Sequence, residues 1–195
     1  MKRFISIILN VTFILTIING QAADSFKKGD IAPNWSLKSN QGKFEFLNNW
    51  TVEHGRQLRK PSTQPDRHVV VITFFATWCP PCVKQLNPLE DIFKQYKNEK
   101  IKFFIVDITE ASRKDSKDND WPTAKSLLEE KKITMPILDD NIYSAASKYE
   151  IKAIPTIFVI DKFQTVQEVI KGFDEKDDLK ETFKLSKIIE ELLAE

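Results

Sequence analysis

Apolar runs rich in β-branched and aromatic side chains recur along the chain and predict buried strands. The strongest run, Val69–Phe75, has the pattern of a central strand that is covered on both faces. Further strands are predicted over residues 101–108, 151–160 and 165–170. A turn at 161–164 separates the last two, and residues 133–138 form a short extended piece.

Apolar residues with helical spacing follow residue 82 and recur near the C-terminus. The first of these helices presents one apolar face, formed by Leu86, Leu89, Ile92, Phe93 and Tyr96. The terminal helix, residues 174–193, is predicted to turn five apolar residues inward, namely Leu179, Phe183, Ile188, Ile189 and Leu192. Shorter helices are expected over 121–132, with Pro122 in the first turn, and over 141–149.

The N-terminal part of the chain has a different pattern. Residues 31–37 and 43–47 predict a β-hairpin extension around a turn at 40–42. Residues 48–67 hold Gly55, two prolines and His54 with little periodicity, so we interpret them as a surface excursion that ends beside His68. Residues 109–120 are polar and predict a solvated loop. Strands that alternate with helices predict an α/β fold with a central mixed sheet flanked by helices.

Residues 1–22 have the pattern of a signal peptide for export. Lys2 and Arg3 supply positive charge, residues 4–18 are mostly apolar, and small residues at 20–22 predict cleavage after Ala22. The alternative is an uncleaved N-terminal membrane anchor that tethers the chain to the inner membrane. The chain thus divides into this leader, residues 23–68 with the hairpin and the excursion, and the core at residues 69–195.

Composition narrows the class of protein. The 29 basic and 28 acidic residues nearly balance and form no basic stripe, which gives no support for a nucleic-acid partner. About 170 residues remain after the leader, enough for one domain with its own core. The two cysteines, Cys79 and Cys82, are too few and too close together for a disulfide-stapled scaffold.

The segment Cys79-Pro80-Pro81-Cys82 stands where the strand 69–75 passes into the first helix. If Cys79 caps that helix, Cys82 falls in the first turn, where a disulfide can close and open without unfolding. A helix N-terminus stabilises an anion by up to ~2 kcal/mol, but the two prolines remove amide donors. We therefore expect the Cys79 pKa to be lowered moderately, to nearer ~7 than ~3.5, which favours a reductant.

Two separated motifs resemble the thioredoxin fold. They are WCPPC at residues 78–82, after a hydrophobic strand, and IPT at residues 154–156, before a later strand. The segment GDIAPNWSL at residues 29–37 and the leader make the chain similar to the exported TlpA/ResA-like thiol-disulfide oxidoreductases. The resemblance extends from about residue 26 to the C-terminus, apart from the excursion.

This resemblance implies a protein-disulfide reductase in which Cys79 attacks, Cys82 resolves the mixed disulfide, and Pro155 is a cis-proline that faces both. Trp78 is expected beside the disulfide, while the main chain of Ile154 and Pro155 pairs with an extended substrate segment. The substrates would be disulfide-containing exported proteins in the bacterial periplasm. No cofactor is required, and a DsbD/CcdA-like membrane protein would donate the electrons.

The chain departs from that family at the positions that handle protons. Many relatives have glutamate where Gln85 stands, and thioredoxin has a buried aspartate at the position of Thr73. Neither an amide nor a hydroxyl exchanges a proton near neutral pH. Deprotonation of Cys82 must then rely on water or on another acid, for which Glu90 and Asp107 are weak candidates.

Three other interpretations remain open. A structural disulfide would explain two cysteines, but not their position at a strand–helix junction. A disulfide oxidase or isomerase would use the same pair at a higher potential. A metal-binding protein could take Cys79, Cys82, His54 and His68 as ligands, although no second cysteine pair follows the first.

Overall fold

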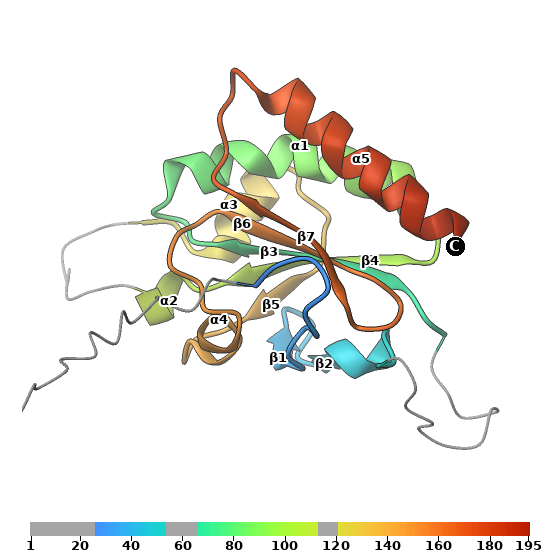
Figure 1. Ribbon diagram of the computed structural model, residues 1–195. Coiled ribbons are helices and arrows are strands. Elements are labelled where there is room, and N and C mark those ends of the chain that lie inside the picture. Colours follow the sequence, from blue (N-terminus) through green and yellow to red (C-terminus); the bar gives the residue numbers. More distant parts are fainter. Residues whose placement is uncertain (1–25, 54–65, 113–120) are drawn as a thin grey trace, which may run out of the picture.

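The computed structural model describes residues 26–53, 66–112 and 121–195. The predicted leader, His54 with most of the excursion, and part of the loop 109–120 therefore lie outside the described residues. Seven strands form one sheet in the order β2-β1-β5-β4-β3-β6-β7. Figure 1 shows this sheet with α1 and α5 together on one of its faces. Within the described ranges, no helix combines the length and the apolar character that crossing a membrane requires.

Strand β3 (Val69–Phe75) is the central strand, and all seven of its residues are buried, as predicted. It pairs in parallel with β4 (Ile101–Asp107) and antiparallel with β6 (Thr156–Ile160). Strand β5 (Ile137–Asp139) extends the sheet beyond β4 in parallel, and β7 (Val166–Lys171) extends it beyond β6 in the antiparallel sense. The predicted mixed sheet is therefore confirmed.

The N-terminal hairpin belongs to the same sheet. Strands β1 (Ser36–Ser39) and β2 (Phe44–Phe46) pair antiparallel, and a 3-10 turn, η1 (Leu47–Asn49), follows them. Strand β1 also pairs with β5, with Lys38 opposite Asp139. The alternation in β2 does not mark a buried face, since Phe44 is 61% and Phe46 38% exposed. Both rings lie on β2, which is an edge strand of the sheet.

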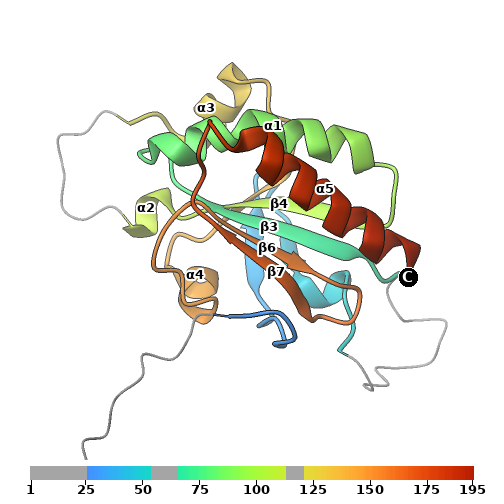
Figure 2. The ribbon, with the colours of Figure 1, turned by 45° about the horizontal axis from the view of Figure 1, so that its top comes forward.

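Helices cover both faces of the sheet. The long helices α1 (Pro80–Tyr96) and α5 (Asp178–Ala194) run side by side over one face, and the short α4 (Ser144–Lys148) lies on the other (Figures 1 and 2). The remaining helices are α2 (Thr109–Ser112) and α3 (Ala124–Glu130). Because successive strand residues point to opposite faces, Thr73 faces α1 while Phe74 packs 5.6 Å from the ring of Tyr149, just after α4.

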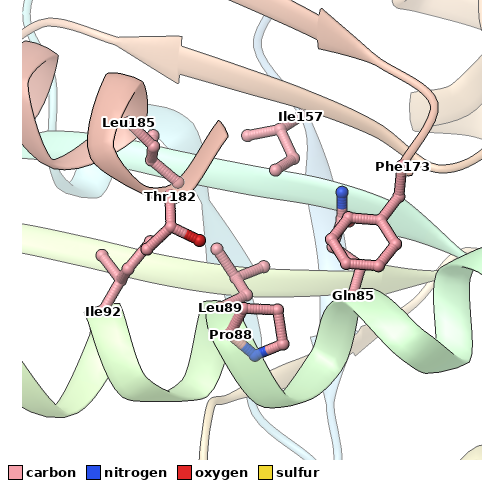
Figure 3. Close-up of a pocket in the computed structure, with 8 residues that line it drawn as sticks. All are labelled: Gln85, Pro88, Leu89, Ile92, Ile157, Phe173, Thr182 and Leu185. Atoms are coloured by element: carbon pink, nitrogen blue, oxygen red, sulfur yellow. The ribbon is translucent and has the colours of Figure 1, made fainter. Parts of the chain in front are cut away.

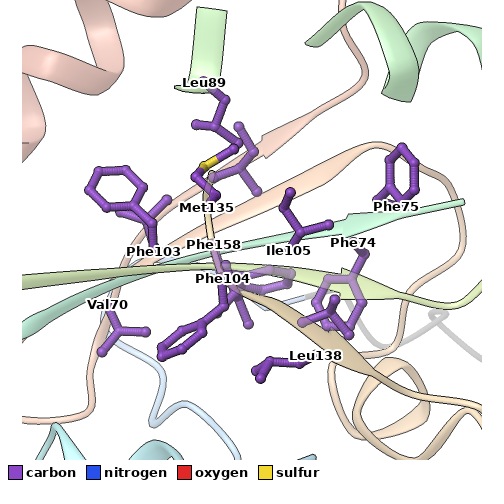
Figure 4. Close-up of a cluster of buried hydrophobic side chains, with 14 of the residues drawn as sticks. Val70, Phe74, Phe75, Leu89, Phe103, Phe104, Ile105, Met135, Leu138 and Phe158 are labelled. Carbon is purple, nitrogen blue, oxygen red and sulfur yellow. The ribbon is translucent and has the colours of Figure 1, made fainter. Parts of the chain in front are cut away.

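Aromatic and branched side chains fill the space between these layers. Figure 4 shows Phe74, Phe104, Ile105 and Phe158 within one buried cluster. Three of them, Phe74, Ile105 and Phe158, are at most 2% exposed. The core therefore holds the central strand rigidly from both sides, including its end at residue 75, where the cysteine segment begins.

Several predicted boundaries are corrected. Helix α3 begins at Ala124, because the Thr123 hydroxyl accepts the backbone N–H of Ser126 and caps the helix, so Pro122 precedes the cap. The strand predicted over 151–160 begins only at Thr156, and the predicted loop 109–120 opens with the turn of helix α2. The extended piece 133–138 and the helix 141–149 shorten to β5 and α4.

The inward face of the terminal helix is also corrected. Phe183 is 71% exposed, whereas Leu185 is 2% exposed and packs inward with Ile189 and Leu192. Those three positions are four and three residues apart and share one helical stripe. Phe183 lies two positions before Leu185, about 200° around the helix, and therefore faces solvent. The side chain of Leu179 lies outside the part of α5 whose side chains are described.

Candidate active site

The cysteine segment is placed by the end of β3 and the start of α1. The Cys79 N–H donates to the Ala76 carbonyl at 3.1 Å, which closes the turn after the strand. Cys79 is the N-cap of α1, with extended backbone angles, and its Sγ accepts the backbone N–H of Cys82 at 3.2 Å. The predicted cap is therefore present, and a sulfur occupies the position that an oxygen usually takes at a helix N-terminus.

Cys79 and Cys82 form a disulfide with a Cα–Cα distance of 5.2 Å. Cys79 is 4% and Cys82 2% exposed, whereas the rings of Pro80 and Pro81 between them are exposed. Burial disfavours a thiolate, while the Cys82 amide and the helix N-terminus favour one. At Cys79, burial and the helix N-terminus therefore act on the thiolate in opposite directions. Cys82 lies inside the first turn, and its N–H is donated to Cys79 Sγ rather than to its own sulfur.

The loop before β6 brings the second predicted motif to the disulfide. The Ile154 carbonyl oxygen lies 3.7 Å from Cys79 Sγ, and the Ile154–Pro155 peptide is cis. Pro155 is buried and Ile154 is half-buried. Residues that are 75 positions apart in the chain thus meet at one sulfur atom. The contact places main-chain polar groups beside Cys79, as the resemblance implied for these residues.

Trp78, immediately before Cys79, is half-buried and packs against the hydrophobic core. Its indole Nε1 and the Thr77 hydroxyl beside it are buried and have no hydrogen-bond partner among the residues that the structure describes. The Thr77 backbone N–H is held at 3.0 Å by the Thr109 hydroxyl, which in turn donates to Asp107. The bond between Thr77 and Thr109 was not predicted from the sequence. Its only signal in the sequence was a threonine shortly after the end of each of two neighbouring strands.

Asp107 closes β4 and accepts both the backbone N–H and the hydroxyl of Thr109. Burial raises the pKa of Asp107 above its ordinary range, and the nearby charges of Asp139 and Glu110 add to this, while the Thr109 bonds act against it. Through Thr109, Asp107 therefore holds Thr77, which lies two residues before Cys79. Its contacts fit a structural role better than direct proton exchange with the thiols.

The structure brings together Thr73 and Gln85, the two positions at which the resemblance led us to expect an acid. The Thr73 hydroxyl of β3 donates to Gln85 Oε1 of α1 at 3.1 Å, and both residues are at least 95% buried. Glu90, the other candidate acid, is 2% exposed and accepts the backbone N–H groups of Thr134 and Met135 at 2.9 and 3.0 Å. Glu90 thus ties the loop before β5 to α1.

The structure removes His68 from the metal site that we considered for Cys79, Cys82, His54 and His68. His68 immediately precedes β3 and its ring packs against Trp50, while the cysteines follow the other end of that strand. A strand of seven residues is about 23 Å long, so His68 lies far from both sulfurs. Across residues 26–53, 66–112 and 121–195, no three His, Cys, Asp or Glu side chains are placed to share a metal ion.

These features define a thioredoxin-fold protein with a disulfide at the N-terminus of its first long helix. Residues 28–169 match the profile of the AhpC/TSA family, and the chain belongs to that family. This places the chain among the redoxins, in agreement with the resemblance carried by the WCPPC and IPT segments.

Several relatives are similar in sequence. ResA of Oceanobacillus iheyensis, named a thiol-disulfide oxidoreductase, is 22% identical over 88% of this chain and 80% of its own length. The thioredoxin-like protein YneN of Bacillus subtilis is 23% identical over 82% of this chain and 80% of its own. The match to ResA of Geobacillus kaustophilus is 26% identical but spans only 56% of this chain and 58% of that protein.

Solved structures agree on the fold. StoA from Bacillus subtilis superimposes with a TM-score of 0.55, 18% identity and coverage of 78% of this chain and 98% of its own. The peroxidoxin BcpB from Mycobacterium tuberculosis gives 0.58, 18% identity and coverage of 84% and 97%. At these identities the likeness establishes the thioredoxin fold and nothing about substrates.

Proposed function

We propose that this chain is a thiol-disulfide oxidoreductase that reduces disulfides in exported proteins. The observation that carries the proposal is the hydrogen bond from the Cys82 N–H to Cys79 Sγ at the head of α1. A donor aimed at this sulfur stabilises the thiolate that attacks a disulfide, and the partner cysteine is already within bonding distance. The names of the ResA relatives describe the same chemistry.

In the reduced protein, the Cys79 thiolate attacks one sulfur of a substrate disulfide. A Cys79–substrate disulfide forms, the substrate S–S bond breaks, and the released substrate thiolate takes up a proton. Cys82 then attacks Cys79 Sγ, which regenerates the disulfide and releases the second substrate thiol. The substrate gains two electrons and two protons, and the cysteine pair loses them.

Main-chain recognition beside Cys79 is the second part of the proposal. The Ile154 carbonyl, 3.7 Å from Cys79 Sγ, can accept an N–H from an extended substrate segment that approaches this sulfur. Trp78 and Pro155 would flank that segment. Recognition of this kind reads the backbone rather than particular side chains, so it suits protein substrates of varied sequence.

The place of reaction and the electron source complete the proposal. The pattern of residues 1–22 supports export to the periplasm, with the N-terminal segment either cleaved after Ala22 or retained as a tether. A reductant in an oxidising compartment requires re-reduction, for which a DsbD/CcdA-like membrane protein is the proposed donor. Mass determination of the mature protein from an expressing cell would distinguish a cleaved leader from a retained one.

The function can be tested by trapping the mixed disulfide. Cys82→Ser leaves Cys79 bonded to its substrate, and exported proteins captured through Cys79 can be identified after reduction. Cys79→Ser is the matched control and should capture nothing and fail to reduce insulin. An active Cys79→Ser variant would refute the assigned attack.

The direction of electron flow needs its own measurement. Equilibration with glutathione should give a potential below about −180 mV for a reductant. A higher potential would favour a disulfide oxidase or isomerase built on the same cysteine pair.

A further inference from the structure

One polar pair lies in the otherwise apolar layer between α1 and the sheet. Thr73 is 2% and Gln85 5% exposed, and the Thr73 hydroxyl donates to Gln85 Oε1 at 3.1 Å. This bond fixes which way the carboxamide faces, since its oxygen points to β3. Figure 3 shows Gln85 reaching from α1 toward the sheet near the ring of Phe173.

The pair is close to the resolving cysteine. Cys82 and Gln85 both belong to the buried face of α1 and are three positions apart. Side chains with this spacing are neighbours on a helix surface, with about 5–6 Å between Cβ atoms. Gln85 is therefore the first polar side chain that Cys82 meets along the buried face of its own helix.

A small cavity adjoins the carboxamide. Its volume is about 20 Å³, and its other lining residues include Pro88, Leu89, Ile157 and Phe173. A space of this size can hold about one water molecule. The only other polar side chain in its lining is Thr182. No ionisable side chain lines the cavity, which lies wholly within the described residues.

Charged groups on the surrounding elements face elsewhere. Strands β3 and β6 carry none. On α1, Lys84 pairs with the exposed Glu175, Glu90 is engaged two turns farther along, and Asp91 and Lys94 are exposed. Asp107 holds Thr109, and Lys102 covers Trp50. On β7, Glu168 pairs with Lys184 and Lys171 is exposed. The described charged side chains of α3, α5 and the loops before β6 and α5 are exposed: Lys125, Glu129, Glu130, Glu150, Lys152, Asp174, Glu175, Lys176, Asp177, Lys180, Lys184, Lys187, Glu190 and Glu191.

We infer that Gln85, held by Thr73, is a positioning residue that gives Cys82 a fixed neutral neighbour, so that the Cys82 thiol loses its proton to solvent. This inference rests on the proposed function and concerns its second step. The Cys82 proton passes to water, the Cys82 thiolate bonds to Cys79 Sγ, and the electron pair of the broken bond leaves with the substrate sulfur. The rate of the resolving step then depends on the ionisation of the Cys82 thiol, with no side-chain base from the described part of the chain taking the proton.

The inference predicts different pH dependences for the two steps. Dithiobis-nitrobenzoate is a suitable probe, because each step releases one coloured thiolate. The first release reports attack by Cys79 and the second reports resolution by Cys82. In the reduced wild-type protein, the second rate should rise about tenfold per pH unit from pH 5 to pH 8 without a bend, as expected for a thiol that is mostly protonated there.

The outcomes separate the inference from the function. Absence of the first release would refute the proposed function. A normal first release, with a second rate that is flat or bends below pH 7, would refute the inference alone, because it would reveal a titrating partner of Cys82. This measurement needs no variant and therefore does not depend on the folding of one.

Variants sharpen the test. Gln85→Glu places a carboxylate beside Cys82 and should add a bend to the second-release profile, with a departure of at least tenfold from the wild-type line at one end of the range. The matched control, Asn87→Asp, makes the same amide-to-acid change at an exposed position of α1 and should keep the wild-type profile. A Gln85→Glu profile identical to wild type would overturn the inference.

Discussion

Glu90 is the one buried carboxylate on α1, and its contacts predict a structural role that can be separated from catalysis. It is 2% exposed, accepts two backbone N–H groups and the hydroxyl of Thr134, and lies 3.4 Å from the ammonium of Lys94. It also stands eight positions after Cys82, about 12 Å along the helix axis. We therefore expect changes at Glu90 to alter stability and leave both redox steps intact.

The size of the effect follows from the bonds that each substitution removes. In Glu90→Gln, an amide oxygen can still accept both N–H groups, but two charge-assisted bonds become neutral ones, at a cost of about 1 kcal/mol each. In Glu90→Ala, the buried N–H of Met135 loses its acceptor and Thr134 must turn to water. We expect a loss of about 2 kcal/mol for the first variant and about 3–5 kcal/mol for the second.

Urea unfolding of the oxidised proteins measures these losses, and the two-step thiolate release measures the chemistry. Asp91→Asn, an exposed change on the same helix, is the control and should cost less than ~0.5 kcal/mol. If Glu90→Gln slowed the second release tenfold while its unfolding free energy matched wild type, Glu90 would be part of the proton path and our reasoning would be wrong.

Three further changes test other parts of the structure. Because the folded-state pKa of Asp107 is raised, chiefly by burial, its contribution to stability is greatest below ~pH 4 and is lost as pH rises through the folded value. The unfolding free energy of Asp107→Asn, relative to that of wild type, should therefore be higher at pH 7.5 than at pH 4.5 in urea unfolding. The same difference at both pH values would contradict this. Leu185→Ala should cost about 2–4 kcal/mol, whereas Phe183→Ser, on the exposed side of the same helix, should stay within ~0.5 kcal/mol, and thermal melting of the pair would expose a reversed order. Thr123→Ala removes the cap of α3 and should cost about 1 kcal/mol, whereas Thr123→Ser should retain most of it in the same assay.

The central sheet was predictable because its strands carry their own signal. Val69–Phe75 and Ile101–Asp107 are buried on both faces, so nearly every position is apolar and no choice of face is required. The terminal helix required such a choice, and the prediction that included Phe183 was wrong. Apolar residues occur on both sides of that helix, and only packing on the sheet selects the stripe of Leu185 and Ile189.

In the candidate active site, too, local features could be predicted from the sequence and long-range contacts could not. The cap at Cys79 is a local feature, and a strand followed by a helix was enough to predict the N–H that meets its sulfur. The bond between Thr73 and Gln85 joins a strand to a helix, so no local pattern specifies it, and only the resemblance had drawn attention to both residues. The support that Thr109 gives to Thr77 spans 32 positions and had no comparable signal.

The surroundings of the two sulfurs support the different tasks that we propose for Cys79 and Cys82. Cys79 Sγ receives a backbone N–H and faces the Ile154 carbonyl, where a substrate can approach. Cys82 points into the layer between helix and sheet and is neighboured by the neutral Gln85. Both sulfurs are buried, but only Cys79 Sγ accepts a backbone N–H, which supports the proposal that Cys79 is the attacking thiolate. In the proposed mechanism Cys79 therefore makes the first attack, and Cys82 reacts once the mixed disulfide gives it an S–S bond to break.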